Sequence, residues 1–353
     1  MKFRLSFLLA AALLALSLTP TPAPAQALGD SQVIAPVPLP GFPEGIATRG
    51  NRFYVSGPAA FGLPLGSAFV HAYDIRTGAL NATYPITITN PFAGISAASC
   101  AAFGPDGKLY VIEPFVGVIR MHLDPGNTQS VYSAFTPTGP SLLNDLAFDD
   151  DGNLYVTDSF AATIYKVPAG GGAPAVWFTD PALAGHPLIP FGVNGIRIDK
   201  NNKKVYVSVT VDATFNGVIY RLPLVASPVA TDLELFASLG FTGPDGIAFG
   251  KSGKLYVAEA LSSTIKVLNP DGSVDAVYAG PALNPPGSPV PWANPANIAF
   301  DDQEGTLLVT NHASLVPFDP TLFLVFESSS TTRACRCPSR GDDHDESGTD
   351  AYR

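Results

Sequence analysis

The sequence predicts an all-β protein that folds as a six-bladed β-propeller with four antiparallel strands per blade. A block of a polar residue, a small residue, an aliphatic residue and usually alanine, then a turn and an aromatic or aliphatic strand, occurs six times in 353 residues. The copies begin at Glu44, Ser99, Asn144, Asn194, Asp245 and Ala296. Their spacings of 55, 45, 50, 51 and 51 residues fit propeller blades and are too long for helical solenoid or leucine-rich repeats. The 33 glycines and 34 prolines agree with many short strands joined by turns.

The third copy contains all four strands that a blade requires. It reads NDLAFDD, NLYVTD, TIYKVPA and AVWFTD, with D-D-G-N and A-G-G-G as turns. The sixth copy ends after LFLVFE without a fourth strand, whereas the segment before the first copy resembles a strand with nothing preceding it. We therefore expect residues 32–39 to complete the last blade, because closing the ring removes exposed sheet edges.

The two ends of the chain differ from the repeats. Residues 1–27 combine Lys2 and Arg4 with an apolar stretch and small residues, which predicts a signal peptide cleaved after Ala25 or Ala27. An uncleaved anchor is the alternative, but the apolar run is short for a membrane span. No cysteine follows the run, so we expect a secreted or periplasmic protein, not a lipoprotein, with no membrane span after signal removal. The propeller should occupy residues 28–326, and the polar segment 327–353 should be a disordered tail.

Charge and cysteine content limit the partners. The formal net charge of −10 argues against nucleic-acid binding and fits a protein that holds a cation. We expect a monomer acting on a small molecule. Cys100 falls in an inner strand and should be buried, and no function is assigned to Cys335 and Cys337.

The leading residue of each copy should lie in one ring at the mouth of the axial channel, because a radial fold brings equivalent positions together. Long irregular loops should emerge on the same face, where functional sites usually lie. Carboxylates at Glu44 and Asp245 and amide oxygens at Asn144 and Asn194 form an all-oxygen set. Such a set suits one divalent cation, with calcium expected and magnesium or manganese as alternatives. The competing interpretation is that these side chains only cap the inner strands.

Other polar residues lie near the same face. A second partial ring of side chains ends the second strands, and we expect it to bond neighbouring blades or, alternatively, to add ligands to the ion. Its members are Glu113, Asp158, Glu259 and Asn311. His186 should make a local hydrogen bond, with a role as base the alternative, and His312 is assigned no role.

Several motifs resemble one known family. They are E-G-I-A at Glu44, L-N-D-L-A-F-D-D-D-G-N-L-Y-V-T-D around Asn144, V-N-G-I around Asn194 and P-D-G-I-A-F around Asp245. Together they resemble the gluconolactonase, regucalcin and luciferin-regenerating enzyme family, over most of the chain. The resemblance implies a six-bladed propeller with one catalytic divalent metal, usually calcium, held by Glu44, Asn194 and Asp245. It also implies that Asn144 lies beside the metal and contacts the substrate or its water.

The chain departs from this family at Leu142, where lactonases acting on sugar acids commonly carry arginine. Loss of that cation removes a partner for hydroxyl-rich or anionic substrates. The loops should instead form an apolar funnel, although each of its residues has packing between blades as an alternative. The funnel residues are Phe61, Phe92, Leu188, Phe191, Phe241 and Trp292.

The sequence thus predicts an exported, metal-dependent hydrolase of a fairly apolar lactone or ester. The cation would polarise the carbonyl, Asp245 would be both ligand and proton acceptor, and Asn144 would orient the water or the carbonyl. A non-catalytic NHL-type propeller, with a structural ion and loops that bind a ligand or protein, is the main alternative. A carbon-bond-forming propeller of the strictosidine synthase type is a weaker one.

Overall fold

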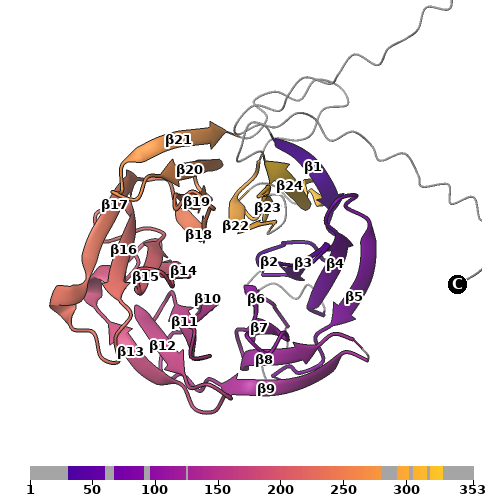
Figure 1. Cartoon of the computed structure of the whole chain (residues 1–353), viewed down its shortest axis with the longest axis horizontal. Helices are drawn as coiled ribbons and strands as arrows, with labels where there is room; N and C mark the ends of the chain where they lie inside the picture. Colours follow the sequence, from indigo (N-terminus) through magenta and orange to yellow (C-terminus); the bar gives the residue numbers. More distant parts are fainter. Residues whose placement is uncertain are drawn as a thin grey trace, which may run out of the picture.

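The computed structural model is a ring of six four-stranded antiparallel sheets, which confirms the all-β six-bladed propeller (Figure 1). It describes residues 31–59, 67–90, 96–124, 126–279, 292–301, 305–315 and 319–328. The expected signal peptide and nearly all of the expected tail lie outside these residues. In the described ranges, no helix has both the length and the apolar character to cross a membrane.

Each of the first five blades is built from four consecutive strands. The first blade comprises β2 (Ile46–Arg49), β3 (Arg52–Gly57), β4 (Phe69–Asp74) and β5 (Leu80–Pro85). The second comprises β6 (Ala101–Phe103), β7 (Leu109–Glu113), β8 (Gly117–His122) and β9 (Thr128–Ala134). The third comprises β10 (Leu143–Phe148), β11 (Leu154–Asp158), β12 (Thr163–Val167) and β13 (Ala175–Thr179). The fourth comprises β14 (Val193–Asp199), β15 (Lys204–Val209), β16 (Gly217–Pro223) and β17 (Glu234–Gly240), and the fifth β18 (Pro244–Phe249), β19 (Leu255–Glu259), β20 (Thr264–Leu268) and β21 (Val274–Ala279).

The sixth blade joins the two ends of the propeller. Its strands are β22 (Pro295–Phe300), β23 (Leu307–Asn311), β24 (Leu324–Ser328) and, on the rim, β1 (Ser31–Pro36). β1 runs antiparallel to β24, with Val33 opposite Phe326. This pairing confirms that the N-terminal strand closes the ring, and β24 extends two residues beyond the expected end of the propeller.

The first strand of every blade lies nearest the axis, and the fourth lies on the rim (Figure 1). The apolar core is divided among the interfaces between adjacent blades. For example, Tyr54 of the first blade is buried in one cluster with Leu109 of the second, and Phe53 of the first blade is buried with Phe323 next to the sixth. Because each blade packs against both neighbours, the rigid ring depends on the completion of the sixth blade.

We predict that Phe326→Ala lowers the free energy of unfolding by about 3–5 kcal/mol, because it leaves a cavity beneath the closing strand. Phe326 is completely buried and packs edge to face with Trp292. Urea unfolding would measure the change. Val277→Ala is a suitable control because Val277 is exposed on the rim strand β21, and its effect should stay within about 0.5 kcal/mol. Equal effects of the two substitutions would contradict the role given to β1 and β24.

Candidate metal centre

Backbone irregularities coincide with the leading positions of the repeats. In the last four blades the pairing of the first two strands shifts register at the leading residue, for example between Leu143 and Leu146 and between Pro244 and Ile247. A β-bulge leaves the extra residue unpaired and redirects its side chain, and bulges are frequent beside active sites. The repeated bulge therefore separates the leading side chains from the regular alternation of the sheet.

Hydroxyl groups from the neighbouring blades fix the carbonyls of these leading residues. The Oγ1 atom of Thr157 donates to the Asn194 carbonyl at 2.5 Å, and Oγ of Ser208 donates to the Asp245 carbonyl at 2.6 Å. Thr310 Oγ1 donates to the Glu44 carbonyl at 2.8 Å, which continues the pattern across the closure of the ring. Each hydroxyl comes from the second strand of one blade and reaches a residue in, or just before, the first strand of the next. The positions of the ring residues are therefore set by pairs of blades.

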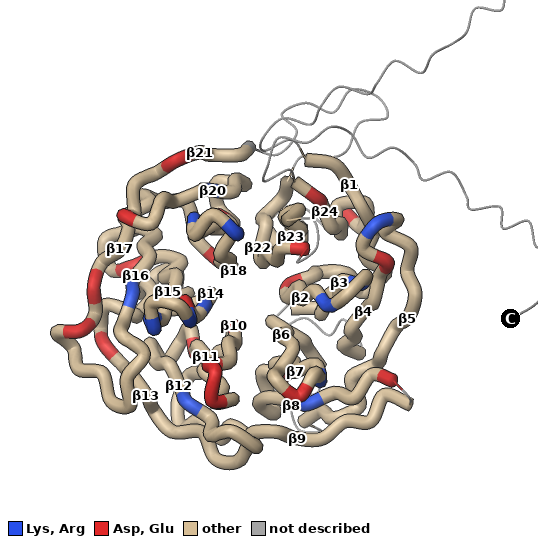
Figure 2. The backbone as a smooth tube through the Cα atoms, in the orientation of Figure 1, with Lys and Arg blue, Asp and Glu red and all other residues tan. Residues whose placement is uncertain are grey.

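Three of the four expected side chains lie close together: the charges of Glu44 and Asp245 interact, and Asn194 hydrogen-bonds to Asp245. Asn144 directly precedes Asp145, whose charge acts on both carboxylates. Glu44, Asn144 and Asn194 are buried, and Asp245 is partly buried. Burial, followed by the charge of Asp145, raises the pKa of Glu44 to about 8. Burial, followed by the charges of Glu44 and Asp145, raises the pKa of Asp245 well above its usual value, and a hydrogen bond from Asn194 opposes this. Figure 2 shows charged positions at the inner strands of the ring as well as on the rim.

The amide groups leave oxygen atoms without partners. Oδ1 of Asn144 and Oδ1 of Asn194 are buried and accept no hydrogen bond from the described part of the chain. Nδ2 of Asn194 donates to Thr210 Oγ1 at 3.0 Å, which fixes the orientation of this amide. An unsatisfied buried acceptor costs about 1–3 kcal/mol, so two of them beside two repelling carboxylates call for a cation. The residues present therefore fit a hard divalent ion.

The two remaining ring positions do not add to this donor set. Ser99 uses its hydroxyl to donate to the Leu143 carbonyl at 3.2 Å, and Ala296 has no ligand atom. Among the described residues, no group of three or more His, Cys, Asp or Glu side chains converges as a metal site. The candidate site therefore consists of two carboxylates and two amide oxygens, and its role in holding an ion stays a prediction.

His312 is a member of the site that the sequence analysis did not assign. Its Nε2 atom lies 3.6 Å from Oε2 of Glu44, and its Nδ1 atom is 2.9 Å from the Ser314 hydroxyl. Burial lowers the pKa of His312 to about 4, so the imidazole is neutral near pH 7. His312 follows β23 of the sixth blade, which neighbours Glu44 of the first only because the ring closes. The sequence could have predicted this contact, because in a closed ring the sixth blade, which contains His312, lies beside the first, which contains Glu44.

The second partial ring was interpreted wrongly, because its members mainly serve their own blades. Asp158 accepts hydrogen bonds from the Leu142 and Phe160 backbone N–H groups, and Asn311 accepts one from Ala293. These contacts fix the loops that lead into and out of the inner strands. The exception is Glu259, whose partner Lys266 also donates to the Leu239 carbonyl of the fourth blade, at 3.3 Å.

The loop residues expected to form a funnel differ in their exposure to solvent. Phe61 and Phe92 lie outside the described residues, while Leu188, Phe191 and Phe241 are exposed. Trp292 is only 3 % exposed and belongs to the core, so its assignment to the funnel was wrong and the packing alternative holds.

Two further loop residues, Leu142 and His186, make local hydrogen bonds. Leu142 is buried, with its N–H bonded to Asp158. His186 accepts a local hydrogen bond from the Leu188 N–H at 3.1 Å, as expected.

An aromatic surface covers one side of the same face. All exposed phenylalanines in the described ranges lie on loops of the third, fourth and fifth blades at this end of the channel: Phe160, Phe191, Phe215 and Phe241. Ring centroids are 5.6 Å apart for Phe160 and Phe191, and 6.1 Å apart for Phe215 and Phe241. Phe215 has a left-handed φ of 62°, which is unusual for a bulky residue, and its ring stacks 3.7 Å from that of His186. We call these four residues the phenylalanine surface.

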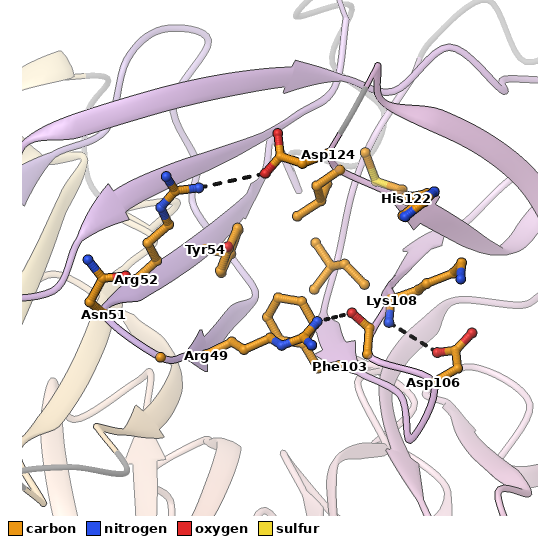
Figure 3. A pocket seen from close by; sticks show the side chains of 14 residues that line it. Arg49, Asn51, Arg52, Tyr54, Phe103, Asp106, Lys108, His122 and Asp124 are labelled. Atoms are coloured by element: carbon orange, nitrogen blue, oxygen red, sulfur yellow. Dashed lines mark hydrogen bonds and ion pairs between the residues drawn. The ribbon is translucent and has the colours of Figure 1, made fainter.

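The opposite face of the propeller carries open clefts between blades. One cleft of about 530 Å³ lies between the first two blades, and Figure 3 shows the side chains that line it. Arg49 donates to the Gly107 carbonyl and lies over the Phe103 ring, and Arg52 pairs with Asp124 at 3.8 Å. These arginines already have partners, and none of the ring residues lines the cleft. The channel mouth is therefore the stronger candidate site.

Fold and site together define a six-bladed propeller with a cluster of oxygen-bearing side chains on its inner strands. The family model described as the SMP-30/gluconolactonase/LRE-like region matches residues 68–313, and the chain belongs to this family. It is similar to the diisopropyl-fluorophosphatase of Loligo vulgaris, with 23% identity over 293 residues that cover 78% of this chain and 86% of the squid protein. The match confirms the resemblance inferred from the repeat motifs.

Solved structures support the same architecture. A calcium-binding regucalcin from Agrobacterium tumefaciens superposes with a TM-score of 0.60 and 17% identity, over 87% of this chain and 93% of the other. A gluconolactonase from Xanthomonas campestris gives a TM-score of 0.55 and 16% identity, over 88% and 98% of the two chains. At these identities the structural matches establish the fold alone.

We predict that Glu113→Gln stabilises the protein at pH 8 but not at pH 5. Glu113 is completely buried at the end of β7, and burial raises its pKa from 4.5 to about 7 against hydrogen bonds from backbone N–H groups such as that of Phe115. Between these values the folded protein holds a proton that the unfolded chain releases. The contribution of Glu113 to the free energy of unfolding is therefore complete below pH 4.5, and it is lost as the pH rises through 7. The loss should be about 3 kcal/mol at pH 8, because the pKa rises from 4.5 to about 7 and each pKa unit corresponds to about 1.4 kcal/mol.

Urea unfolding of the wild type and the variant at both pH values would measure the difference. Glu259→Gln is a matched control, because Glu259 ends the equivalent strand β19 but pairs with Lys266 at 2.7 Å. The Glu259→Gln substitution should lower the free energy of unfolding at pH 8, because it breaks a buried ion pair. A Glu113→Gln variant with the same pH dependence as the wild type would contradict the prediction.

Proposed function

We propose that the protein is a metal-dependent hydrolase that acts on a lactone or ester at the channel mouth. The observation that carries the proposal is the pairing of two buried, unsatisfied amide oxygens with two mutually repelling carboxylates. Membership of the family and the names of the squid diisopropyl-fluorophosphatase and the Xanthomonas gluconolactonase favour hydrolysis. The name of the calcium-binding regucalcin favours calcium as the ion.

The residues of the site have distinct roles in this proposal. Glu44, Asn194 and Asp245 would hold the cation, which supplies polarisation of the substrate carbonyl when it is bound. Asn144 would orient the attacking water through Oδ1, which accepts a hydrogen bond, or the carbonyl through Nδ2, which donates one. Asp245 would accept the proton from the water while it also serves as a ligand of the ion.

His312 assists at the other edge of the site. Its neutral imidazole stands 3.6 Å from Glu44, and its Nε2 atom makes no hydrogen bond within the described chain. In the proposal this buried, unsatisfied nitrogen would form a hydrogen bond with a water molecule or a polar group of the substrate that enters the site. The placement of a hydrogen-bonding group beside a cation ligand orients the reactants without adding charge.

The substrate class follows from the surroundings of the ring. Leu142 offers no cation for an anionic or hydroxyl-rich substrate, and the phenylalanine surface offers apolar area on the adjacent loops. A lactone or ester with a large apolar group would lie across both.

We further propose that the protein acts outside the cytoplasm as a monomer. The N-terminal sequence supports the first part of this proposal, and the closed ring supports the second.

We predict that the purified protein binds Ca²⁺ and hydrolyses aryl esters or lactones only when the ion is present. Isothermal titration with Ca²⁺ and a substrate panel with and without chelator would measure both properties. Asp245→Asn should weaken Ca²⁺ binding at least about tenfold, because one of two charges opposite the ion is lost.

Asp271→Asn is the control for this loss of charge, since Asp271 lies on an exposed turn between β20 and β21 and its carboxylate accepts hydrogen bonds from Ser273. It should change neither binding nor turnover. Hydrolysis that survives complete removal of the ion would refute the metal-dependent mechanism. A firmly bound ion with no turnover on any substrate would favour the non-catalytic NHL-type propeller.

We predict that Phe241→Ala raises KM for bulky aryl esters about 3- to 10-fold and leaves kcat unchanged, because aromatic contacts contribute about 0.5–1.5 kcal/mol. The KM for a small acetate ester should not change. Leu80→Ala provides the control, since Leu80 is similarly exposed but lies on the rim strand β5. An equal change in KM for bulky and small esters would exclude the phenylalanine surface from substrate binding.

A further inference from the structure

A guanidinium group spans the inner ring beside the candidate cation site. Arg197 lies on β14, three residues after Asn194. Its Nη1 atom donates to Oδ2 of Asp145 at 2.6 Å, and its Nη2 atom donates to Oδ1 of Asn297 at 3.2 Å. Asp145 belongs to the third blade and Asn297 to the sixth, so one side chain of the fourth blade joins strands that are not neighbours in the ring.

Asp145 is the third carboxylate of this region. It is 1 % exposed, directly follows Asn144, and lies close enough to Glu44 and Asp245 for their charges to interact. Its oxygens also accept hydrogen bonds from the Leu146 N–H at 2.8 Å and the Ile196 N–H at 3.0 Å. A buried carboxylate in this position needs a positive partner, and Arg197 supplies it.

The other end of the arginine contacts an asparagine whose side chain is itself held by two further hydrogen bonds. Nδ2 of Asn297 donates to Sγ of Cys100 at 2.8 Å, while its Oδ1 also accepts the Ile298 N–H. The side chain of Asn297 passes Gly246 of the fifth blade, where a Cβ atom would lie only 2.5 Å from Oδ1. The absence of a side chain at Gly246 therefore leaves space for the link from Arg197 to the sixth blade.

We propose that Arg197 sets the charge of the cation site and thereby selects a divalent ion. By pairing with Asp145 it removes that carboxylate from the ligand set, and it leaves Glu44 and Asp245 as the two uncompensated charges. Two negative charges balance a divalent ion, whereas three would favour a trivalent one. Arg197 is thus a positioning residue that acts through Asp145, and the inference rests on the cation site of the proposed function.

The test compares Ca²⁺ with Tb³⁺ by isothermal titration of the full-length protein. In Arg197→Met the ratio of the Tb³⁺ to the Ca²⁺ association constant should rise about tenfold or more, because Asp145 becomes a third charge facing the ion. The double variant Asp145→Asn with Arg197→Met should return the ratio to the wild-type value. Arg221→Met is the matched control on the same blade, since Arg221 pairs with Glu234 at the surface, and it should leave the ratio unchanged.

Failure of the inference and failure of the proposed function are distinguishable. A wild-type protein that binds neither ion refutes the cation site itself. A wild-type protein that binds Ca²⁺, together with an Arg197→Met ratio within about twofold of the wild type, overturns the role of Arg197 alone.

If Arg197→Met does not fold, Asp145→Asn replaces it. This single variant leaves the guanidinium without its anionic partner, and it should weaken Tb³⁺ binding more than Ca²⁺ binding. Equal effects on both ions would overturn the inference.

Discussion

The candidate site depends on one repeated interaction, in which a hydroxyl of one blade binds the backbone carbonyl of a ring residue in the next blade. Ser208 and Thr310 make this contact for Asp245 and Glu44, which are the two carboxylates of the site. A carboxylate that is held through its backbone keeps its side-chain oxygens available to a ligand. The ligand atoms are thus positioned by backbone bonds between blades, so the site does not have to be assembled by the ion.

The architecture was predictable because its determinants are local and repeated. A hydrophobic strand pattern that recurs about every fifty residues specifies blades, and the same periodicity places Glu44, Asn194 and Asp245 at equivalent positions. The closure of the ring by β1 was also predictable, since one copy lacked a strand and the N-terminal segment had one to spare. In these cases position in the repeat determined position in space.

The remaining features depend on contacts that the repeat does not encode. Arg197 replaces the alanine found at its position in most copies, and its partners Asp145 and Asn297 lie 52 and 100 residues away. Trp292 falls in a long loop but turns into the core, and His312 reaches Glu44 only through the closure of the ring. The second partial ring was interpreted wrongly for a related reason. The order of the strands predicts where its side chains lie along the axis, but it does not predict which backbone N–H groups donate hydrogen bonds to them.

The pairing of β1 with β24 also constrains the order of events during synthesis. During synthesis, β1 has no partner until nearly 300 further residues have been made, because Val33 pairs with Phe326. Contacts this distant in sequence form slowly, since a long loop must close before they are gained. A growing chain therefore lacks one strand of its last sheet, and the ring closes only when the C-terminal strand β24 is available to pair with β1.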